Sequence, residues 1–170
     1  MNLVSGPTAL VGVSGVNMIG VRSAAEMLKA MQELHQYADI VVFSAAVADY
    51  RPKEISRIKI KKKDSELALE LEKTEDIAAI LGKVKTDKQI HVGFALETND
   101  EEFNAKSKLE RKNFDLIILN SLQDKGAGFR YDTNKITIFD RKNNKKEFEL
   151  KSKSEVAADI IEAVYGFLLG

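Results

Sequence analysis

The chain has 170 residues, and its 26 basic and 26 acidic side chains cancel to a formal net charge of zero. This length suits one domain with a sizeable core, and the balanced charge gives no global field toward nucleic acid or a membrane surface. The chain has no cysteine, which excludes a disulfide framework, a thiol nucleophile and a Cys-type zinc site. No apolar run reaches the roughly 20 residues of a membrane helix, and residues 1–4 do not resemble a signal peptide. We therefore expect a cytoplasmic protein.

The first part of the chain predicts strands separated by a loop and a helix. Leu3–Ser5 is a short apolar strand that ends at Gly6-Pro7, and Val16–Val21 is a second one. Ser23 and Glu26 form a capping box, which satisfies the first free amides of a helix. The apolar run Ile40–Phe43 then predicts a buried strand.

The remainder of the chain continues the alternation of strands and helices. Two capping signals lie here, at Asp100 or Asn99 for a helix that runs to about Lys112, and at Ser152 with Glu155 for a final helix. Asn143-Asn144 resembles a hairpin turn. The predicted elements are a half-exposed strand over 67–71, a helix over 77–81, strands over 89–96 and 116–119, and hairpin strands over 135–139 and 146–150. This order predicts an α/β fold, with a Rossmann-like, mainly parallel sheet, helices on both faces and a β-hairpin arm.

A cluster of basic side chains follows the Ile40–Phe43 strand. Residues 45–52 read AAVADYRP, and residues 59–62 read KIKK. Ligands of α/β proteins bind at the carboxyl ends of parallel strands, and ammonium groups there favour a phosphorylated ligand. The alternative is a solvated basic loop.

Several other side chains are candidates for the same site, each with an alternative reading. Asp49 follows a strand and could accept hydrogen bonds from a ligand, or cap its own turn. Lys59 offers a charge to a phosphoryl oxygen, and Phe94 could stack on a base or belong to the core. Lys108 and Lys112 lie at i and i+4 on one helix face, where they could bind a polyphosphate or remain solvated.

Other chemistries are poorly represented in the sequence. His35 and His91 are far apart and have no metal-ligand companion, and no G-x-G-x-x-G, Walker or G-x-S-x-G motif occurs. Asn120 ends a strand, where it could orient a polar ligand group or form a turn. The residues alone indicate a nucleotide-binding or phosphate-binding α/β domain.

Taken together, several motifs resemble the phosphopantothenoylcysteine synthetase domain of the bacterial bifunctional coenzyme A biosynthesis protein. The similarity covers nearly the whole chain, and the AAVADYRP and KIKK pair is the most specific part of it. The motifs are Ser5-Gly6-Pro7, AAVADYRP at 45–52, KIKK at 59–62, KTEDI at 73–77, GFALETN at 93–99, NFDLI at 113–117 with Asn120, and Gly128-Phe129 before Asp132-Thr133-Asn134.

The resemblance implies a phosphopantothenate–cysteine ligase of coenzyme A biosynthesis. Such an enzyme joins 4′-phosphopantothenate to cysteine, with CTP and Mg²⁺, through an acyl-cytidylate. The resemblance also implies a homodimer, formed by the Gly128–Asn134 segment and the hairpin. Charge neutralisation by lysines and Mg²⁺ would suit this chemistry.

The resemblance also assigns residues to the CTP site. It implies contacts from Asp49, Lys59 and Phe94, and from the backbone around Lys73, Thr74 and Glu75. Lys108 and Lys112 match the triphosphate-binding lysines of the family, and Ala45 and Ala46 would line the site through their backbone.

The chain departs from the family at its beginning. The family starts with one more strand, a Gly-rich loop and a helix, so we expect a domain over residues 1–170 that is amino-terminally incomplete. We expect an exposed sheet edge or apolar patch in consequence. A separate chain could supply this unit and a decarboxylase. The alternative function is a nucleotide-binding module without ligase activity of its own; a nucleic-acid binder is disfavoured by the zero net charge and by the acidic residues between 64 and 76.

Overall fold

The computed structural model describes residues 1–54, 56, 58–59, 68–121 and 131–169. The described chain divides into two compact units, and each is described by itself. Unit 1 comprises residues 1–36 and 45–77, and unit 2 comprises residues 37–44 and 78–170.

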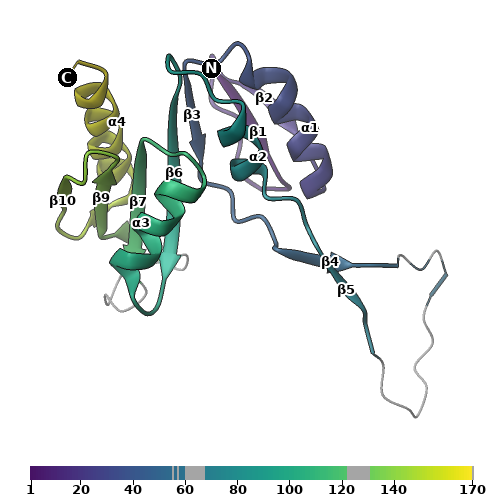
Figure 1. Ribbon diagram of the computed structural model, residues 1–170. Helices are drawn as coiled ribbons and strands as arrows, with labels where there is room; N and C mark the ends of the chain where they lie inside the picture. Colours follow the sequence, from purple (N-terminus) through teal and green to yellow (C-terminus); the bar gives the residue numbers. More distant parts are fainter. Residues whose placement is uncertain (55, 57, 60–67, 122–130, 170) are drawn as a thin grey trace. The chain divides into compact units, whose positions relative to one another are not determined.

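Unit 2 is built on a five-stranded mixed sheet with the strand order β10-β9-β7-β6-β3 (Figure 1). The strands β3, β6 and β7 are mutually parallel, whereas β9 and β10 run antiparallel to their neighbours. The bounds are Ile40–Phe43 for β3, Ile90–Glu97 for β6, Leu116–Ser121 for β7, Ile136–Asp140 for β9 and Lys145–Glu147 for β10. A short antiparallel pair, β8 (Thr133–Asn134) and β11 (Lys151–Ser152), accompanies this sheet.

Each face of the unit 2 sheet is covered by a helix. The helix α3 (Glu101–Arg111) buries Ala105 and Leu109 in a cluster with Ile117 and Phe139. On the opposite face, α4 (Lys153–Leu169) buries its apolar stripe, Val156, Ile160 and Val164, against residues of β6, β7 and β9. Alternate residues of β7 enter the two clusters, because successive side chains of a strand point to opposite faces. The predicted α/β fold with helices on both faces is confirmed.

The two predicted capping boxes both begin helices. The Ser23 hydroxyl accepts a hydrogen bond from the Glu26 amide (3.2 Å) and begins α1 (Ala24–His35) in unit 1. The Ser152 hydroxyl accepts one from the Glu155 amide (3.3 Å), and the Glu155 carboxylate accepts the Ser152 amide in return (3.0 Å). These reciprocal bonds satisfy the amides that a helix start leaves free.

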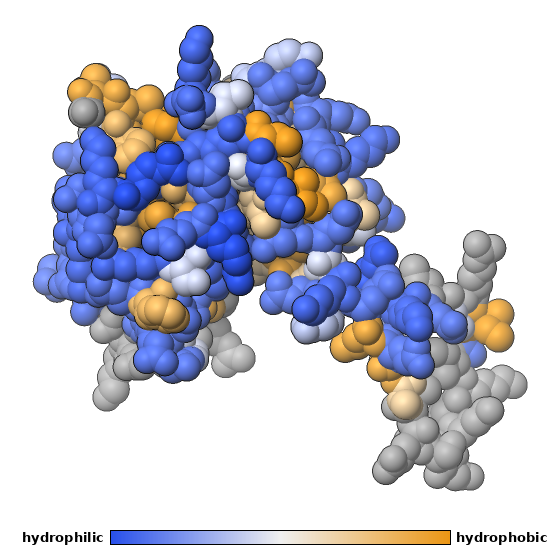
Figure 2. Space-filling model, viewed as in Figure 1, coloured by the Kyte–Doolittle hydropathy of each residue, from blue (hydrophilic) through white to orange (hydrophobic). Residues whose placement is uncertain are grey.

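Unit 1 contains two separate pairs of strands. β1 (Asn2–Ser5) and β2 (Asn17–Gly20) pair in parallel, and β4 (Tyr50–Pro52) pairs antiparallel with β5 (Leu71–Lys73). The second pair is the β4–β5 ribbon, which Figure 2 shows as mostly hydrophilic, with a few apolar patches. The short helix α2 (Ile77–Lys83) begins at the last residue of unit 1.

Three predicted elements differ in detail from the structure. The hairpin at Asn143-Asn144 forms, but it is the outer edge of the unit 2 sheet, with β10 ending at Glu147. Of the alternating segment over 67–71, residue 67 lies outside the described residues, and among residues 68–71 only Leu71 belongs to a strand, because that strand begins where pairing with β4 begins. β3 is an edge strand of the described sheet, so Val41 is buried while Val42 is 45% exposed.

None of the helices that the structure describes combines the length and the apolarity that crossing a bilayer requires.

Candidate functional site

The carboxyl ends of β6 and β7 lie side by side in unit 2. Leu96 pairs with Asn120 and Glu97 with Ser121, so both strands finish at the same edge of the sheet. Glu97 shares the face of Ala95, which packs with α3, whereas Asn120 lies on the face of Ile118, which packs with α4. Glu97 and Asn120 therefore lie at the same edge of the sheet but on opposite faces of it.

On the α3 face of this edge, Glu97 and Lys108 form an ion pair, which we call the carboxyl-edge pair. Lys108 Nζ lies 2.5 Å from Glu97 Oε1, and the side chains are 33% and 13% exposed. Oε1 is buried and accepts no hydrogen bond of regular geometry, so the contact is electrostatic. A half-exposed ammonium held by a mostly buried carboxylate could bind an anion that displaces that carboxylate.

The loop that joins β6 to α3 is fixed by its own polar groups. The Asn104 side chain donates to the Asn99 carbonyl (2.9 Å), and Thr98 Oγ1 bonds to the Asn99 side chain (3.2 Å). Asp100 precedes the helix in a left-handed conformation (φ 45°) and makes no side-chain cap bond. Asp100 therefore occupies the N-cap position that the sequence predicts, but its side chain does not make the capping bond.

On the α4 face, Asn120 Oδ1 accepts a hydrogen bond from Asn134 Nδ2 (2.8 Å). Asn134 is buried, and its own Oδ1 accepts the Lys135 amide (3.1 Å). This pair ties the end of β7 to β8. Asn120 is thus engaged in a structural contact at the position where a ligand-orienting role was considered.

Phe94 packs against the α4 face of the sheet and not toward α3. The preceding glycine does not leave room for a ligand, because a Cβ at Gly93 would lie 2.1 Å from the Phe114 ring. Gly93 is required for that core ring to pack on β6. The structure therefore places Phe94 and Lys108 on opposite faces of the sheet.

Lys112, the other predicted lysine of this helix, is the C-cap residue of α3. Its amide donates to the Lys108 carbonyl (3.0 Å). Its own carbonyl lies against Gly82, where a Cβ would come within 2.2 Å of it. The backbone of Lys112 thus has a packing role that its sequence position does not reveal.

In unit 1, the β4–β5 ribbon brings Asp49, Lys73 and Thr74 together. Lys73 pairs with Tyr50, and the Thr74 amide donates to the Asp49 carbonyl (2.9 Å). The Thr74 hydroxyl donates to the Ala48 carbonyl. These contacts explain why two motifs that are far apart in the sequence belong to one local structure.

The other predicted residues of unit 1 are exposed. These are Ala45, Ala46, Lys59 and Glu75, and Asp49 and Lys73 are exposed as well. The rest of the KIKK motif (residues 60–62) and Gly128-Phe129 lie outside the described residues. Unit 1 thus holds the predicted residues from Ala45 to Glu75, and unit 2 holds Phe94, Lys108 and Lys112.

The fold and the ion pair of Glu97 and Lys108 together define an α/β domain that carries an ammonium group, suited to bind an anion, at the carboxyl end of a parallel strand. The family model for the DNA/pantothenate metabolism flavoprotein C-terminal domain matches residues 1–167, and the chain belongs to this family.

Three relatives show how the family members are organised. A cysteine/cysteine sulfinic acid decarboxylase from an unknown prokaryotic organism is 54% identical over 96% of this chain and 46% of its own length. The coenzyme A biosynthesis bifunctional protein CoaBC of Bacillus subtilis (strain 168) is 44% identical over 95% of this chain and 40% of its own length. The crystal structure of the C-terminal domain of a CoaBC protein superposes with a TM-score of 0.81 at 37% identity, covering 98% of this chain and 74% of that one. The chain therefore spans less than half the length of these two curated relatives, and the relatives named CoaBC are bifunctional proteins.

These comparisons contradict the identification of the chain as a phosphopantothenoylcysteine synthetase domain. The matching family is described as the C-terminal domain of a DNA/pantothenate metabolism flavoprotein, and the 54% identical relative is named a decarboxylase. The predicted CTP-dependent phosphopantothenate–cysteine ligase activity is corrected accordingly, together with its alternative as a nucleotide-binding module. The lysine-rich motifs misled the prediction because ammonium groups near a strand end indicate an anion without specifying the reaction. The name of the 44% identical relative refers to coenzyme A biosynthesis.

The predicted CTP and Mg²⁺ are contradicted by the same findings, since a flavoprotein family implies a flavin. The described residues of the carboxyl edge do not fit a flavin ring. The space above Gly93 is filled by Phe114, and Phe94 belongs to the core. No reaction step is therefore assigned to a flavin on these residues.

Two residues of the edge were missed by sequence reasoning. Glu97 lies within the GFALETN motif and Asn134 within the Asp132–Asn134 motif. An acidic residue directly after an apolar strand is a recognisable signal, so Glu97 could have been found as the partner of a nearby lysine. Asn134 has no such signal, because its partner Asn120 is distant in sequence and meets it only through the fold.

Proposed function

We propose that the chain is the C-terminal domain of a protein that decarboxylates a cysteine-derived carboxylate in coenzyme A or cysteine metabolism. Its own share is to bind the anionic end of the substrate, while bond cleavage belongs to the part of the longer protein that this chain does not span. The name of the 54% identical relative supports a cysteine-derived carboxylate as the substrate, and the name of the 44% identical relative supports coenzyme A metabolism.

The main observation that supports substrate binding by this chain is the carboxyl-edge pair. Lys108 is partly exposed and has one counter-ion, Glu97, among the ion pairs of the described residues. A substrate carboxylate or sulfinate could take the place of Glu97 at Lys108 Nζ. The free energy of binding gained from this contact is modest, because an exposed ion pair contributes only about 0.2–1 kcal/mol.

The test is calorimetric or NMR titration of this chain with cysteine sulfinate. We expect binding that is weakened roughly fivefold by Lys108→Ala, the upper end of what an exposed ion pair supplies. Glu97→Gln should strengthen binding, because the competing carboxylate is removed. Lys106→Ala is the matched control, since Lys106 is on the same helix but pairs with Glu102 (2.8 Å).

Two outcomes would contradict the proposal. Equal affinity of the Lys108→Ala and Lys106→Ala variants would show that Lys108 does not bind the anion. Release of labelled CO₂ from cysteine sulfinate by this chain alone would show that bond cleavage is not confined to the remainder of the longer protein.

The predicted site residues of unit 1 remain part of the proposal as a second anion-binding group. Asp49, Lys73 and Thr74 are already joined by the β4–β5 pairing. Lys73→Ala should weaken binding of the phosphorylated substrate 4′-phosphopantothenate–cysteine but not of cysteine sulfinate, which lacks a phosphate. Equal effects on both ligands would remove Lys73 from the site.

We also propose that residues 1–170 work as one functional domain, in the cytoplasm, as a homodimer. The edge position of β10 in the described sheet supports the dimer, because edge strands offer unpaired backbone groups to a second copy. Sedimentation velocity of a monomer at every concentration would contradict the dimer.

A further inference from the structure

The strand β3 of the unit 2 sheet is left bare on one of its faces. Ile40 and Val42 pair with Ile90 and Val92 of β6, whose side chains belong to the cluster on the α4 face. Paired residues share a face, so Ile40 and Val42 point to the α4 face as well, and both are exposed there. Val41, on the other face, is buried. Among the described residues of unit 2, α2 and α3 pack on that other face, whereas α4 packs over β6, β7 and β9.

The helix α4 has a second apolar stripe beside the one that it buries. Ile161, Tyr165 and Leu168 follow one another at steps of four and three residues, so they form one ridge along the helix. Each of the three side chains is more than half exposed. A helix of a globular protein that is apolar on a further side is expected to bury that side against another element.

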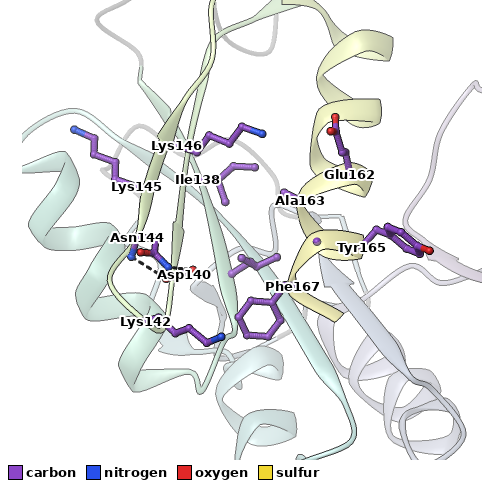
Figure 3. Close-up of a pocket in the computed structure, with 12 residues that line it drawn as sticks. Ile138, Asp140, Lys142, Asn144, Lys145, Lys146, Glu162, Ala163, Tyr165 and Phe167 are labelled. Carbon is purple, nitrogen blue, oxygen red and sulfur yellow. Dashed lines mark hydrogen bonds between the residues drawn. The ribbon is translucent and has the colours of Figure 1, made fainter. Parts of the chain in front are cut away.

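The exposed ridge of α4 points away from the β9–β10 hairpin. A hollow of about 550 Å³ lies between the hairpin and α4, and Figure 3 shows the Tyr165 ring on the side of α4 that is opposite to the hairpin lysines. In the strand order β10-β9-β7-β6-β3, the side of α4 away from the hairpin is the side of β6 and β3. The ridge and the bare face of β3 therefore border one apolar surface, which we call the α4–β3 surface. It consists of Ile40, Val42, Ile161, Tyr165 and Leu168.

The α4–β3 surface has the width of one helix. The buried stripe of α4 contacts residues of β6, β7 and β9, so the helix axis lies near β7. Neighbouring strands are about 4.8 Å apart, which puts β3 roughly 10 Å from β7. Packed helices lie about 8–10 Å apart. A helix packed against the ridge of α4 would therefore lie over β3 and bury Ile40 and Val42.

The solved CoaBC domain indicates the source of such a helix. This chain covers 74% of that domain, so about a quarter of the domain has no counterpart here, although the matched parts superpose with a TM-score of 0.81. We propose that the α4–β3 surface binds an amphipathic helix from the part of the longer protein that this chain does not span. The apolar stripe of that helix packs on Ile161, Tyr165 and Leu168 and on the bare face of β3. This inference shares with the proposed function the premise of a longer protein, but not its reaction.

The experiment uses the residues of the CoaBC domain that have no counterpart in this chain, made as a separate polypeptide. Its titration into this chain, followed by calorimetry and by NMR shifts of the α4 and β3 amides, should show saturable binding. Ile161→Lys should weaken binding roughly tenfold or more, because a charge then enters a desolvated contact. Ile161 is exposed, so this variant should keep the urea midpoint of the parent chain. Tyr165→Ala, which removes a ring without adding a charge, should weaken binding as well.

Phe103→Lys is the matched control, since Phe103 is an exposed apolar residue of α3, on the other face of the sheet, and gains the same charge. It should leave the affinity for the polypeptide unchanged. Absence of binding, or equal weakening by Phe103→Lys and Ile161→Lys, would overturn the proposal. A dimer of this chain that Ile161→Lys dissociates in sedimentation velocity would also overturn it, because a second copy would then cover the surface. Failure of cysteine sulfinate alone to bind would remove the proposed function and leave this inference standing.

Discussion

Units 1 and 2 bury their apolar side chains to very different extents. In unit 2, Val92, Ile117 and Ile118 are completely buried between two helices. In unit 1, Leu3 and Met18 of the β1–β2 pair are 43% and 40% exposed, and the strand residue Leu71 is 57% exposed. The difference teaches that a wide sheet with covered faces forms its own core, whereas two-stranded pairs do not.

This contrast also separates two kinds of site. The carboxyl-edge pair is built on β6 and α3 of unit 2, and strands and helices position side chains more reproducibly than loops do. The predicted residues of unit 1 lie mostly in exposed segments. Substitutions that compare equivalent features of the two units therefore measure how far stability is concentrated in unit 2.

The largest contrast is expected for buried against exposed apolar side chains. Ile117→Ala should lower the free energy of unfolding by roughly 2–5 kcal/mol, because it opens a cavity in a packed core. Leu71→Ala, on the β4–β5 ribbon, should change it by less than about 0.5 kcal/mol. Urea denaturation followed by circular dichroism measures both, and equal losses would contradict the contrast.

A second contrast compares two strand glycines. Gly93→Ala would place a methyl group 2.1 Å from the Phe114 ring. The ring must shift, at an expected cost of about 1–3 kcal/mol.

Gly20→Ala in β2 is the matched control, since a Cβ there meets no atom within 4 Å. It should be neutral or slightly stabilising, because alanine restricts the unfolded chain. Unfolding midpoints of the two variants decide the matter, and a Gly93→Ala protein as stable as its Gly20→Ala counterpart would show that Phe114 has room to move.

These contrasts also explain which parts of the fold the sequence predicted. β3, β6 and β7 were placed to within about two residues because each is an apolar run, and their helices carry apolar stripes. The two serine capping boxes were found because the capping bond is local. The β4–β5 ribbon was not recognised as a pair, because Tyr50 meets Lys73 only through a long intervening segment.

The same distinction between local and long-range contacts explains which site residues the sequence predicted. Lys108 was selected from its helix spacing, but its ion pair with Glu97 and the separation of Phe94 onto the other face depend on the register of the sheet. A hollow in unit 2 was not predicted, because its lining comes from β7, β9, the hairpin and α4, and no single segment carries a signal for it.

A third contrast compares the two capping serines. Ser152→Ala in unit 2 should cost about 1 kcal/mol, because the helix loses the hydroxyl that accepts the Glu155 amide. Glu155 has a lowered pKa because of its hydrogen bonds to Ser152, so the substitution should also return that pKa toward 4.5.

Ser23→Ala in unit 1 removes the corresponding bond to the Glu26 amide. In both helices the glutamate carboxylate keeps its bond to a backbone amide, from Arg22 (2.9 Å) or from Ser152 (3.0 Å). The Ser152 hydroxyl, however, also donates to the Glu155 carboxylate (2.6 Å), so the loss at Ser23 should be the smaller one. Hydrogen exchange of the first-turn amides, in α1 for Ser23→Ala and in α4 for Ser152→Ala, compares the two variants. A larger rise in exchange rate in α1 than in α4 would contradict the expectation that Ser152→Ala costs more.

The smallest expected difference between the two units is in how the stability of α1, in unit 1, and of β6, in unit 2, responds to pH. His35, at the end of α1, is buried, and desolvation lowers its pKa from 6.5. The folded state therefore binds fewer protons than the unfolded state between the lowered value and 6.5, so stability is full above 6.5 and falls as the pH drops through that interval.

Hydrogen exchange from about pH 8 to about pH 5, the range of histidine titration, should show α1 losing protection while β6 changes less. The His35→Gln variant should lose the pH response of α1, after correction for the intrinsic exchange rate. An unchanged response would assign it to another group and remove burial of His35 as its cause.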